Sequence, residues 1–333
     1  MQAQVIFNPP ATIVYWEDGD KTVVRCDNDV FSEEFGYAMA CMRKAYGSRG
    51  EFKAQFKNAF RPYLKPNKKG KDKNKDASHT ALPPKSKISV SFGKDSLAML
   101  LRLMEENWPL DIVVFYDTGM EFDCIYKIRD KIRPVLKERG VEYVELKPKI
   151  PFLYSMLEKE VNSRQKGTHY GYGWCGGLCR WGTSEKLREI KQFKDSLAES
   201  VIDYVGIAFD EPKRFDKATQ EGKMLPLVQW QMTEGDCLNF CHERGFYWIE
   251  RVANCGVEYM DLYSILDRIS CWCCCNKNLK ELRNIYRYLP NYWQRLKDLQ
   301  AKIDRPFKGY YKGQAKGIFE LEERFSKELV NQS

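Results

Sequence analysis

The sequence is poor in histidine and has no long apolar run. Only three histidines occur among its 333 residues, so histidine can contribute little to a catalytic constellation. No uncharged apolar stretch approaches the roughly 18 to 20 residues that a membrane-spanning helix needs. The N-terminal residues MQAQVIFNPP also lack the basic start and long apolar segment of a secretory signal. We therefore expect a cytoplasmic protein that does not enter a membrane.

The composition is globular, and its surplus of positive charge is confined to one segment. Hydrophobic residues make up 43% and charged residues 30% of the chain, which excludes a collagen-like or wholly disordered protein. The net charge is +8, but residues 61–87 alone hold nine Lys or Arg against two Asp. Residues 65–87 are rich in Lys, Pro, Gly and Asn and predict a flexible basic linker. Such a linker is a solvated tether or, alternatively, a docking arm for an acidic partner.

Residues 1–64 predict a small unit of their own. The Asp18-Gly19 pair favours a tight two-residue turn, so residues 12–16 and 22–26 are expected to form a β-hairpin. Apolar residues then recur at helical spacing in residues 35–46 and again in residues 52–60. This pattern is typical of a small core made by a hairpin and helices.

Residues 88–232 alternate predicted strands and helices. Apolar strands are expected at residues 88–91, 111–116, 141–146 and 202–209, separated by helical patterns. This order predicts a doubly wound, mostly parallel α/β sheet with helices on both faces, followed by a helical C-terminal part at residues 233–333. In such a sheet the ligand binds beyond the carboxyl ends of the strands.

The loop after the first of these strands has the chemistry of a phosphate site. It reads Ser91-Phe92-Gly93-Lys94-Asp95-Ser96 and leads into a predicted helix. The helix N-terminus, the two hydroxyls and the lysine all favour an anion, although the spacing of a Walker A loop is absent. The string resembles the PP-loop of the ATP pyrophosphatase and phosphoadenosine phosphosulfate (PAPS) reductase superfamily. Relatives often carry Gly where this chain has Phe92.

Two further segments extend this resemblance, which covers roughly residues 87–302. The string from Asp117 to Phe122 is similar to the Asp-Thr-Gly…Glu-Phe segment of PAPS reductase-like proteins. The string from Gly206 to Arg214 is similar to a segment that helps such relatives hold a nucleotide or its substrate. The resemblance therefore implies nucleotide contacts from residues of all three segments: Ser91, Phe92, Gly93, Lys94, Asp95, Ser96, Asp117, Thr118, Gly119, Gly206 and Glu211.

The implied activity is chemistry at the α-phosphate of ATP or of an adenylyl sulfate nucleotide, in sulfur activation or transfer. Lys94 and the loop amides would stabilise charge on the phosphates, and Arg214 would be a second clamp. Asp95, together with Asp117, would position Mg²⁺. The resemblance thus implies a transferase or oxidoreductase of sulfur metabolism, and similar stand-alone proteins occur in bacteria and their phages.

Six of the twelve cysteines fall into two groups that predict a metal site: Cys175 and Cys179, and Cys271, Cys273, Cys274 and Cys275. A reducing compartment disfavours disulfides, so clustered cysteines indicate ligation of [4Fe–4S] or of tetrahedral Zn²⁺. Resemblance to cluster-bearing adenylylsulfate reductases and to the sulfur-transfer proteins of DNA phosphorothioation favours [4Fe–4S]. Cys275 is the least expected ligand. The expected ligands are Cys179, Cys271 and Cys274, with Cys175 or Cys273 as the fourth.

One departure from the family keeps alternative functions open. Thioredoxin-dependent PAPS reductases end in a Glu-Cys-Gly motif with a nucleophilic cysteine, whereas this chain has no cysteine after Cys275. The alternatives are a non-catalytic nucleotide-sensing or DNA-associated protein of a phage or mobile element, and an adenylyl sulfate reductase. The expected partners are a nucleotide and a sulfur acceptor, which could be a nucleic acid, a metabolite or a protein. His169 is interpreted as a structural or substrate-contact residue rather than a general base.

Overall fold

The structure is a computed structural model that describes residues 4–25, 32–46, 85–163, 167–197, 201–215, 218 and 222–330. The chain divides into two units, Met1–Ser78 and His79–Ser333, which are described separately. The division lies inside the segment 65–87. The predicted helical stripe at residues 52–60 and most of the predicted linker lie outside the described residues. No described helix combines the length and the apolar character needed to cross a membrane.

The N-terminal unit is a three-stranded antiparallel sheet packed against a helix. The strands are β1 (Gln4–Asn8), β2 (Ala11–Tyr15) and β3 (Lys21–Arg25), and the helix is α1 (Glu33–Tyr46). Val14, Val24 and Ala40 form the buried core. The predicted two-residue turn is wrong: Tyr15 pairs with Lys21, so five residues connect the strands. The sequence pattern also missed β1, because only one of its five side chains is even half-buried.

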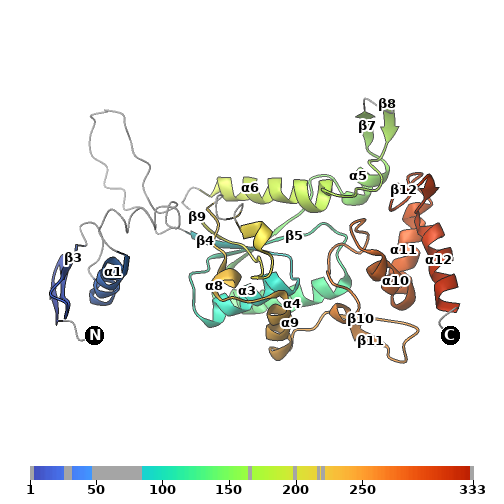
Figure 1. Cartoon of the computed structure of the whole chain (residues 1–333). Coiled ribbons are helices and arrows are strands. Elements are labelled where there is room, and N and C mark those ends of the chain that lie inside the picture. The colour runs from blue at the N-terminus through green and yellow to red at the C-terminus, as the bar shows by residue number, and fades with distance from the viewer. Residues whose placement is uncertain are drawn as a thin grey trace. The chain divides into compact units, whose positions relative to one another are not determined.

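The main unit contains the predicted parallel sheet. Its strands are β4 (Lys85–Val90), β5 (Ile112–Tyr116), β6 (Glu142–Leu146) and β9 (Val201–Tyr204), in the order β6-β5-β4-β9. Helix α6 (Lys186–Ser196) covers one face, and α3 (Lys94–Glu105) and α4 (Asp123–Glu138) cover the other (Figure 1). The doubly wound α/β fold is therefore confirmed. Strand order reverses between β4 and β9, which makes the ends of these strands the expected ligand position.

Two strand boundaries differ from the expected ones by more than one residue. Strand β4 begins at Lys85, three residues before the predicted start, because Lys87 is fully buried and forms an ion pair with Asp203 of β9 at 2.7 Å. Because lysine is not apolar, the apolar pattern in the sequence does not reveal the first residues of this strand. Strand β9 ends at Tyr204, and residues 205–209 form a loop although they are apolar.

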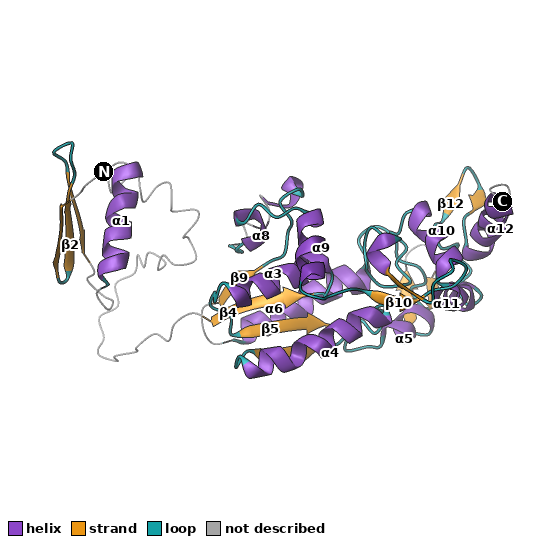
Figure 2. Ribbon diagram, turned by 90° about the horizontal axis from the view of Figure 1, so that it is seen from below, coloured by secondary structure: helices purple, strands orange, loops and turns teal. Residues whose placement is uncertain are grey.

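The elements from β10 onward gather at one end of this sheet, whereas α8 and α9 lie beside α3 (Figure 2). One main core runs through this unit, with members from Ile88 to Phe325. Helix α9 begins after a capping box of Thr233 and Asp236 and lies beside α3. The further elements are α5 (Phe152–Leu157), β7 (Glu160–Ser163), β8 (Gly167–Tyr170), a π-helix (Arg180–Glu185), a 3-10 turn (Pro212–Arg214), α8 (Pro226–Gln229), α9 (Glu234–Glu243), β10 (Ile249–Arg251), β11 (Tyr259–Asp261), a 3-10 turn (Leu262–Ser264), α10 (Leu279–Tyr288), α11 (Pro290–Gln300), β12 (Tyr310–Tyr311), β13 (Gln314–Ala315) and α12 (Ile318–Val330).

Candidate nucleotide site and cysteine cavity

The predicted phosphate loop lies between β4 and α3, at the strand-order reversal. Phe92 has a positive φ of 56°, which explains why glycine suits this position in relatives. Its side chain is fully buried and packs 5.1 Å from the ring of Phe115, and its carbonyl accepts a hydrogen bond from Trp248 Nε1 at 2.7 Å. The side chain of Phe92 therefore belongs to the core, and its predicted ligand contact stays a prediction that would involve the main chain.

The two serines of the loop bond to each other and to the loop backbone. Ser96 Oγ accepts from the main-chain N–H of Ser91 at 3.1 Å and lies 3.2 Å from Ser91 Oγ. Ser91 Oγ in turn lies 3.4 Å from the main-chain nitrogen of Gly93. These contacts give the loop a fixed shape before any ligand enters, which lowers the entropic cost of binding.

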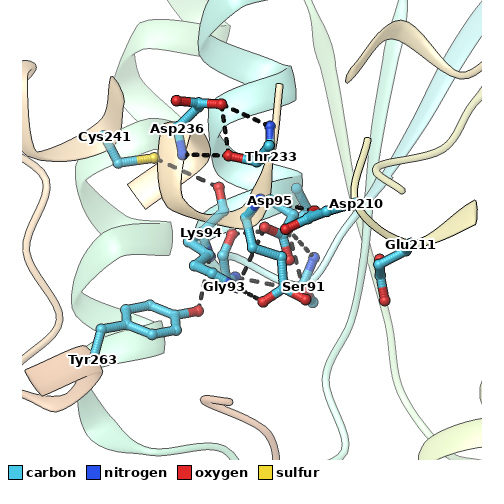
Figure 3. A network of polar contacts seen from close by, with 12 residues as sticks. Ser91, Gly93, Lys94, Asp95, Asp210, Glu211, Thr233, Asp236, Cys241 and Tyr263 are labelled. Atoms are coloured by element: carbon cyan, nitrogen blue, oxygen red, sulfur yellow. Dashed lines mark hydrogen bonds and ion pairs between the residues drawn. The ribbon is translucent and has the colours of Figure 1, made fainter. Parts of the chain in front are cut away.

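Lys94 is held by residues from the C-terminal part of the chain (Figure 3). Its Nζ lies 2.5 Å from Glu234 Oε2 and 3.4 Å from Asp95 Oδ1. Its main-chain N–H donates to the hydroxyl of Tyr263 at 2.9 Å. Burial lowers the pKa of Lys94, but the hydrogen bond to Glu234 and the charge of Asp95 outweigh burial and raise it. Lys94 is therefore a buried cation at the start of α3, with its charge already compensated.

Asp95 is the acidic residue of the first turn of α3. Burial, with a smaller contribution from Glu234 and Glu211, raises the pKa of Asp95 to about 6 although Lys94 opposes the shift. The folded protein therefore binds a proton here between about pH 4 and pH 6, where the unfolded chain does not. Ionising Asp95 thus costs folding stability, and this cost is absent at low pH and complete above about pH 6.

We expect Asp95→Asn to stabilise the protein at about pH 7.5, by about 2 kcal/mol, and to have little effect near pH 4. The amide avoids the desolvation of a buried carboxylate, while Lys94 keeps its ion pair with Glu234. Urea unfolding of both proteins at the two pH values measures the difference. Asp236→Asn is the matched control. It should lower the stability at pH 7.5, because hydrogen bonds from Thr233 lower the pKa of Asp236 and so stabilise its ionised form. An Asp95→Asn effect of equal size at both pH values would contradict this assignment.

The segments after β5 and β9 are the other two predicted parts of the site. Asp117 Oδ1 accepts from the main-chain N–H of Gly119 and from the hydroxyl of Tyr126, both at 2.8 Å, so this carboxylate shapes the turn after β5. A Cβ added to Gly206 would lie 3.3 Å from Ser96 Cα. Glycine at position 206 therefore lets the loop after β9 approach the first turn of α3 closely.

The predicted second clamp, Arg214, is paired with a carboxylate that lies beside the loop. Arg214 is half-exposed, and its guanidinium forms an ion pair with Glu211 Oε2 at 2.6 Å. Glu211 lies close enough to Asp95 to raise its pKa. Figure 3 shows Glu211 and Asp210 at the side of the loop near Asp95. The structure therefore brings Glu211 to the loop, whereas the Arg214 charge is compensated by that same carboxylate.

The two cysteine-bearing loops are joined by one asparagine. Asn276 Oδ1 accepts from the main-chain N–H of Gly177 at 2.8 Å, and Asn276 Nδ2 donates to the Gly177 carbonyl at 2.8 Å. Lys308 Nζ supports the second loop by donating to the carbonyls of Cys275 and Lys277. Segments that lie almost 100 residues apart in the chain are thereby held side by side.

The cysteines of the two loops line one cavity of about 160 Å³. Among the described residues, no group of three or more Cys, His, Asp or Glu side chains is arranged as it would be around a bound metal ion. The thiols nevertheless form an all-sulfur donor set, which is the chemistry that [4Fe–4S] clusters and structural zinc require. The cavity is lined by all the predicted ligands and by the residue predicted to be the least suitable: Cys175, Cys179, Cys271, Cys273, Cys274 and Cys275.

The cysteine cavity adjoins the end of β5. Cys271 Sγ lies 3.6 Å from Thr118 Oγ1 and 3.8 Å from Glu121 Oε1. Burial raises the pKa of Cys271 and of Glu121. The hydrogen bond from Cys179 lowers the pKa of Cys175 to about 6, and the main-chain N–H of Arg180 contributes. A strand-end segment of the predicted nucleotide site is thus in direct contact with a cysteine of the cavity.

Several residues of this arrangement were not found by sequence reasoning. Glu234, Tyr263 and Trp248 contact the phosphate loop from positions more than 130 residues away, and Asn276 joins the cysteine loops. None belongs to a recognisable motif. The only local signal is the position of Asn276 directly after the four cysteines. Cys237 and Cys241, by contrast, are fully buried on α9, as their apolar surroundings predict.

Comparisons with known proteins give one family match and two similar proteins. Residues 85–166 match the model of the phosphoadenosine phosphosulfate reductase domain. An uncharacterised protein of Methanocaldococcus jannaschii is 27% identical over 216 residues, which are 63% of this chain and 41% of that protein. The chain thus spans less than half the length of this relative. The U34-tRNA thiolase NcsA from Methanococcus maripaludis, solved with its [4Fe–4S] cluster, is 13% identical, with a TM-score of 0.35 and coverage of 74% of this chain and 73% of that chain.

Proposed function

Residues 85–166 match the phosphoadenosine phosphosulfate reductase domain, and from this match we propose a PP-loop enzyme that binds ATP or an adenylyl sulfate nucleotide. The enzyme acts at the α-phosphate in sulfur activation or transfer. Residues of the loop Ser91 to Ser96 bind the phosphates, because the first turn of α3 offers main-chain N–H groups and Lys94 offers a cation. Asp95 and Glu211, which lie close enough to interact electrostatically, would hold Mg²⁺ with these phosphates.

The contact between Thr118 and Cys271 is the observation that carries this proposal. The Thr118 hydroxyl belongs to the segment that ends β5, and Cys271 Sγ lies 3.6 Å away. A nucleotide bound beyond the strand ends would therefore have its reactive phosphate near the cysteine cavity. An enzyme that only hydrolysed a nucleotide would have no use for six cysteines at this position.

In the proposed reaction an oxygen of the acceptor attacks the α-phosphorus of ATP. A bond forms between this oxygen and phosphorus, the bond to the bridging oxygen breaks, and pyrophosphate leaves. A hydrosulfide-class donor then attacks the activated carbon of the acceptor, and AMP leaves with the oxygen. Lys94 and the loop amides stabilise the charge that gathers on the phosphates in the first step.

A [4Fe–4S] cluster in the cysteine cavity would carry or deliver sulfur beside the nucleotide. Cys179, Cys271 and Cys274 would hold it, with Cys175 or Cys273 as the fourth ligand, and Zn²⁺ is the alternative metal. Asn276 keeps the two ligand loops together. Lys277 is buried near Cys271, Cys273 and Cys274; burial lowers its pKa, and the negative charge of ligating thiolates would favour its protonated form. A cation at this position compensates part of the negative charge of a thiolate-ligated cluster.

The test is turnover of ATP labelled at the α-phosphate by protein purified without oxygen. We expect AMP and pyrophosphate in equal amounts when an acceptor and a sulfide donor are present. Ser96→Ala should reduce turnover by about tenfold or more, because Ser96 Oγ orders the loop around Ser91. Absence of AMP and pyrophosphate with nucleic-acid, metabolite and protein acceptors would refute the proposed activity.

A second candidate is a protein that binds the nucleotide without turning it over. One observation favours it: Glu234 compensates Lys94, and the Tyr263 hydroxyl occupies a main-chain N–H of the phosphate loop. This candidate predicts nucleotide binding that survives Asp95→Asn and no release of AMP. An adenylyl sulfate reductase would instead release sulfite from adenylyl sulfate, so assaying sulfite, AMP and bound nucleotide separates the three activities.

A further inference from the structure

A second cavity, of about 790 Å³, adjoins the cysteine cavity. One wall is the hairpin of β7 and β8 together with residues 171–173, and the opposite wall is residues 302–305. Met156 lines both cavities, and the main-chain N–H of Arg180, which lines the larger one, donates to Cys175 Sγ at 3.4 Å. The volume lies in the range of about 300 to 1,000 Å³ that is usual for small-molecule sites.

The first wall of this cavity is fixed by main-chain contacts to the end of α5 and to the residues that follow it. The Gly171 N–H donates to the Lys159 carbonyl at 2.7 Å, and the Gly173 N–H donates to the Met156 carbonyl at 2.9 Å. Gly171 has a φ of +70°, and a Cβ at this position would lie 2.3 Å from the Met156 carbonyl oxygen. Only glycine fits there, so the cavity wall is preformed.

Cations in the cavity are not compensated by ion pairs. Arg180, Lys302 and Arg305 line it, and no ion pair joins them to a carboxylate in the described part of the chain. The guanidinium of Arg180 lies over the ring of Tyr172, 4.0 Å from the ring centroid. This contact holds the guanidinium in place and leaves the N–H donors at its edge free. Three such cations favour a phosphate, which arginine binds through paired N–H donors.

Aromatic and acidic groups in the same cavity suit the rest of a nucleotide. Tyr170 is 73% exposed although it lines the cavity, so its ring offers a free face for stacking a base. His169 lies beside it on β8. Glu160 and Asp304 place carboxylates in the cavity that can accept hydrogen bonds from N–H groups of a base.

We propose that this cavity binds a nucleotide unit, free or within a nucleic-acid strand, as the sulfur acceptor. The phosphate lies among Arg180, Lys302 and Arg305, and the base lies against Tyr170 with its reactive edge toward Cys175. This inference rests on the proposed sulfur transfer and names its substrate class. It also assigns a role to the glycine- and tyrosine-rich segment at residues 167–173, which the phosphate-loop chemistry leaves unused.

Direct binding measurements test the cavity without requiring turnover. The probes are a fluorescein-labelled single-stranded RNA dodecamer, followed by fluorescence anisotropy, and uridine monophosphate, followed by calorimetry. Lys302→Glu/Arg305→Glu is expected to weaken binding by about tenfold or more, because it reverses both charges of one wall. Tyr170→Ala should weaken binding by about fivefold or more through loss of stacking, and its exposure makes a folding defect unexpected.

Matched controls separate the cavity from general electrostatics. Lys312→Glu/Lys316→Glu makes the same charge change on residues that contact the ring of Tyr311 outside the cavity, and Tyr259→Ala removes another exposed tyrosine. Both controls should bind within about twofold of the unaltered protein. Binding of the dodecamer alone identifies a nucleotide within a strand as the ligand, and cavity-dependent binding of uridine monophosphate identifies a free nucleotide.

Two results would overturn the inference: no binding of either probe, or equal losses in the cavity variants and in the controls. These results are distinguishable from failure of the proposed function. Cavity-dependent binding without any AMP release from ATP would contradict sulfur activation and leave the acceptor site standing as a binding site. AMP release without cavity-dependent binding would contradict only the acceptor site.

Discussion

Cys271→Ala is expected to remove the metal from protein purified without oxygen, leaving less than about a tenth of the iron of the unaltered protein. Cys271 lines the cysteine cavity and is the thiol that contacts the end of β5 through Thr118. Losing one of four thiolate ligands would open the cluster to solvent. Metal analysis and the visible absorption spectrum measure the effect.

Cys255→Ala is the matched control, since Cys255 is half-buried, lies outside the cavity and donates only to the Val257 carbonyl. It should keep its iron. The Cys271→Ala protein should still bind the nucleotide, because the hydrogen bonds within the loop Ser91 to Ser96 do not involve it. Full iron content in Cys271→Ala would contradict the ligand assignment, and zinc in place of iron in the unaltered protein would establish the alternative metal.

The remaining cavity cysteines should separate into ligands and supporting residues. Cys275 is buried, and its sulfur accepts a hydrogen bond from the main chain of Cys175. Cys275→Ala should therefore reduce stability more than iron content. Cys175→Ala and Cys273→Ala compared with each other identify the fourth ligand, because only one of them should lose the metal. If both retained the metal, a different ligand set would be required.

The phosphate loop and the parallel sheet could be predicted because their signals are local. The segment Ser91 to Ser96 combines small residues, a lysine and a helix start within one turn, and β5 is a run of five buried apolar residues. The ends of β5 and β6 fall at the predicted residues, Tyr116 and Leu146, whereas the apolar residues 205–209 concealed the end of β9. The family match confirms the resemblance over residues 85–166, a shorter range than the one indicated by the motifs.

The partners of these local features could not be predicted, because they depend on which distant segments the fold brings together. Glu234 reaches Lys94 only because α9 packs beside α3. The two hydrogen bonds between Asn276 and Gly177 require both cysteine loops to lie at the same end of the sheet. The early start of β4 escaped detection for the same reason, since the burial of Lys87 makes sense only with Asp203 opposite it.

Asp203→Asn is expected to destabilise the protein by about 3 to 5 kcal/mol, a large fraction of the stability of a typical domain. Asp203 compensates the fully buried Lys87 at 2.7 Å and also contacts Lys194 at 3.3 Å. Burial already lowers the pKa of Lys87 even with this partner present. Without the carboxylate, the lysine must either stay charged in an apolar environment or lose its proton. Urea unfolding at neutral pH measures the loss.

Lys87→Met/Asp203→Asn should recover most of that stability, because no buried charge remains and a methionine fills a similar volume. The double variant thereby separates the cost of an unpaired charge from the value of the pair itself. If the double variant were as unstable as Asp203→Asn, packing around Asp203 rather than charge would control this site.

The ion pair of Lys87 and Asp203 joins β4 to β9, the strands that lead into the phosphate loop and into Gly206. Asp203→Asn should therefore also weaken nucleotide binding, and the double variant should restore it, since both strands regain their register without an uncompensated lysine between them.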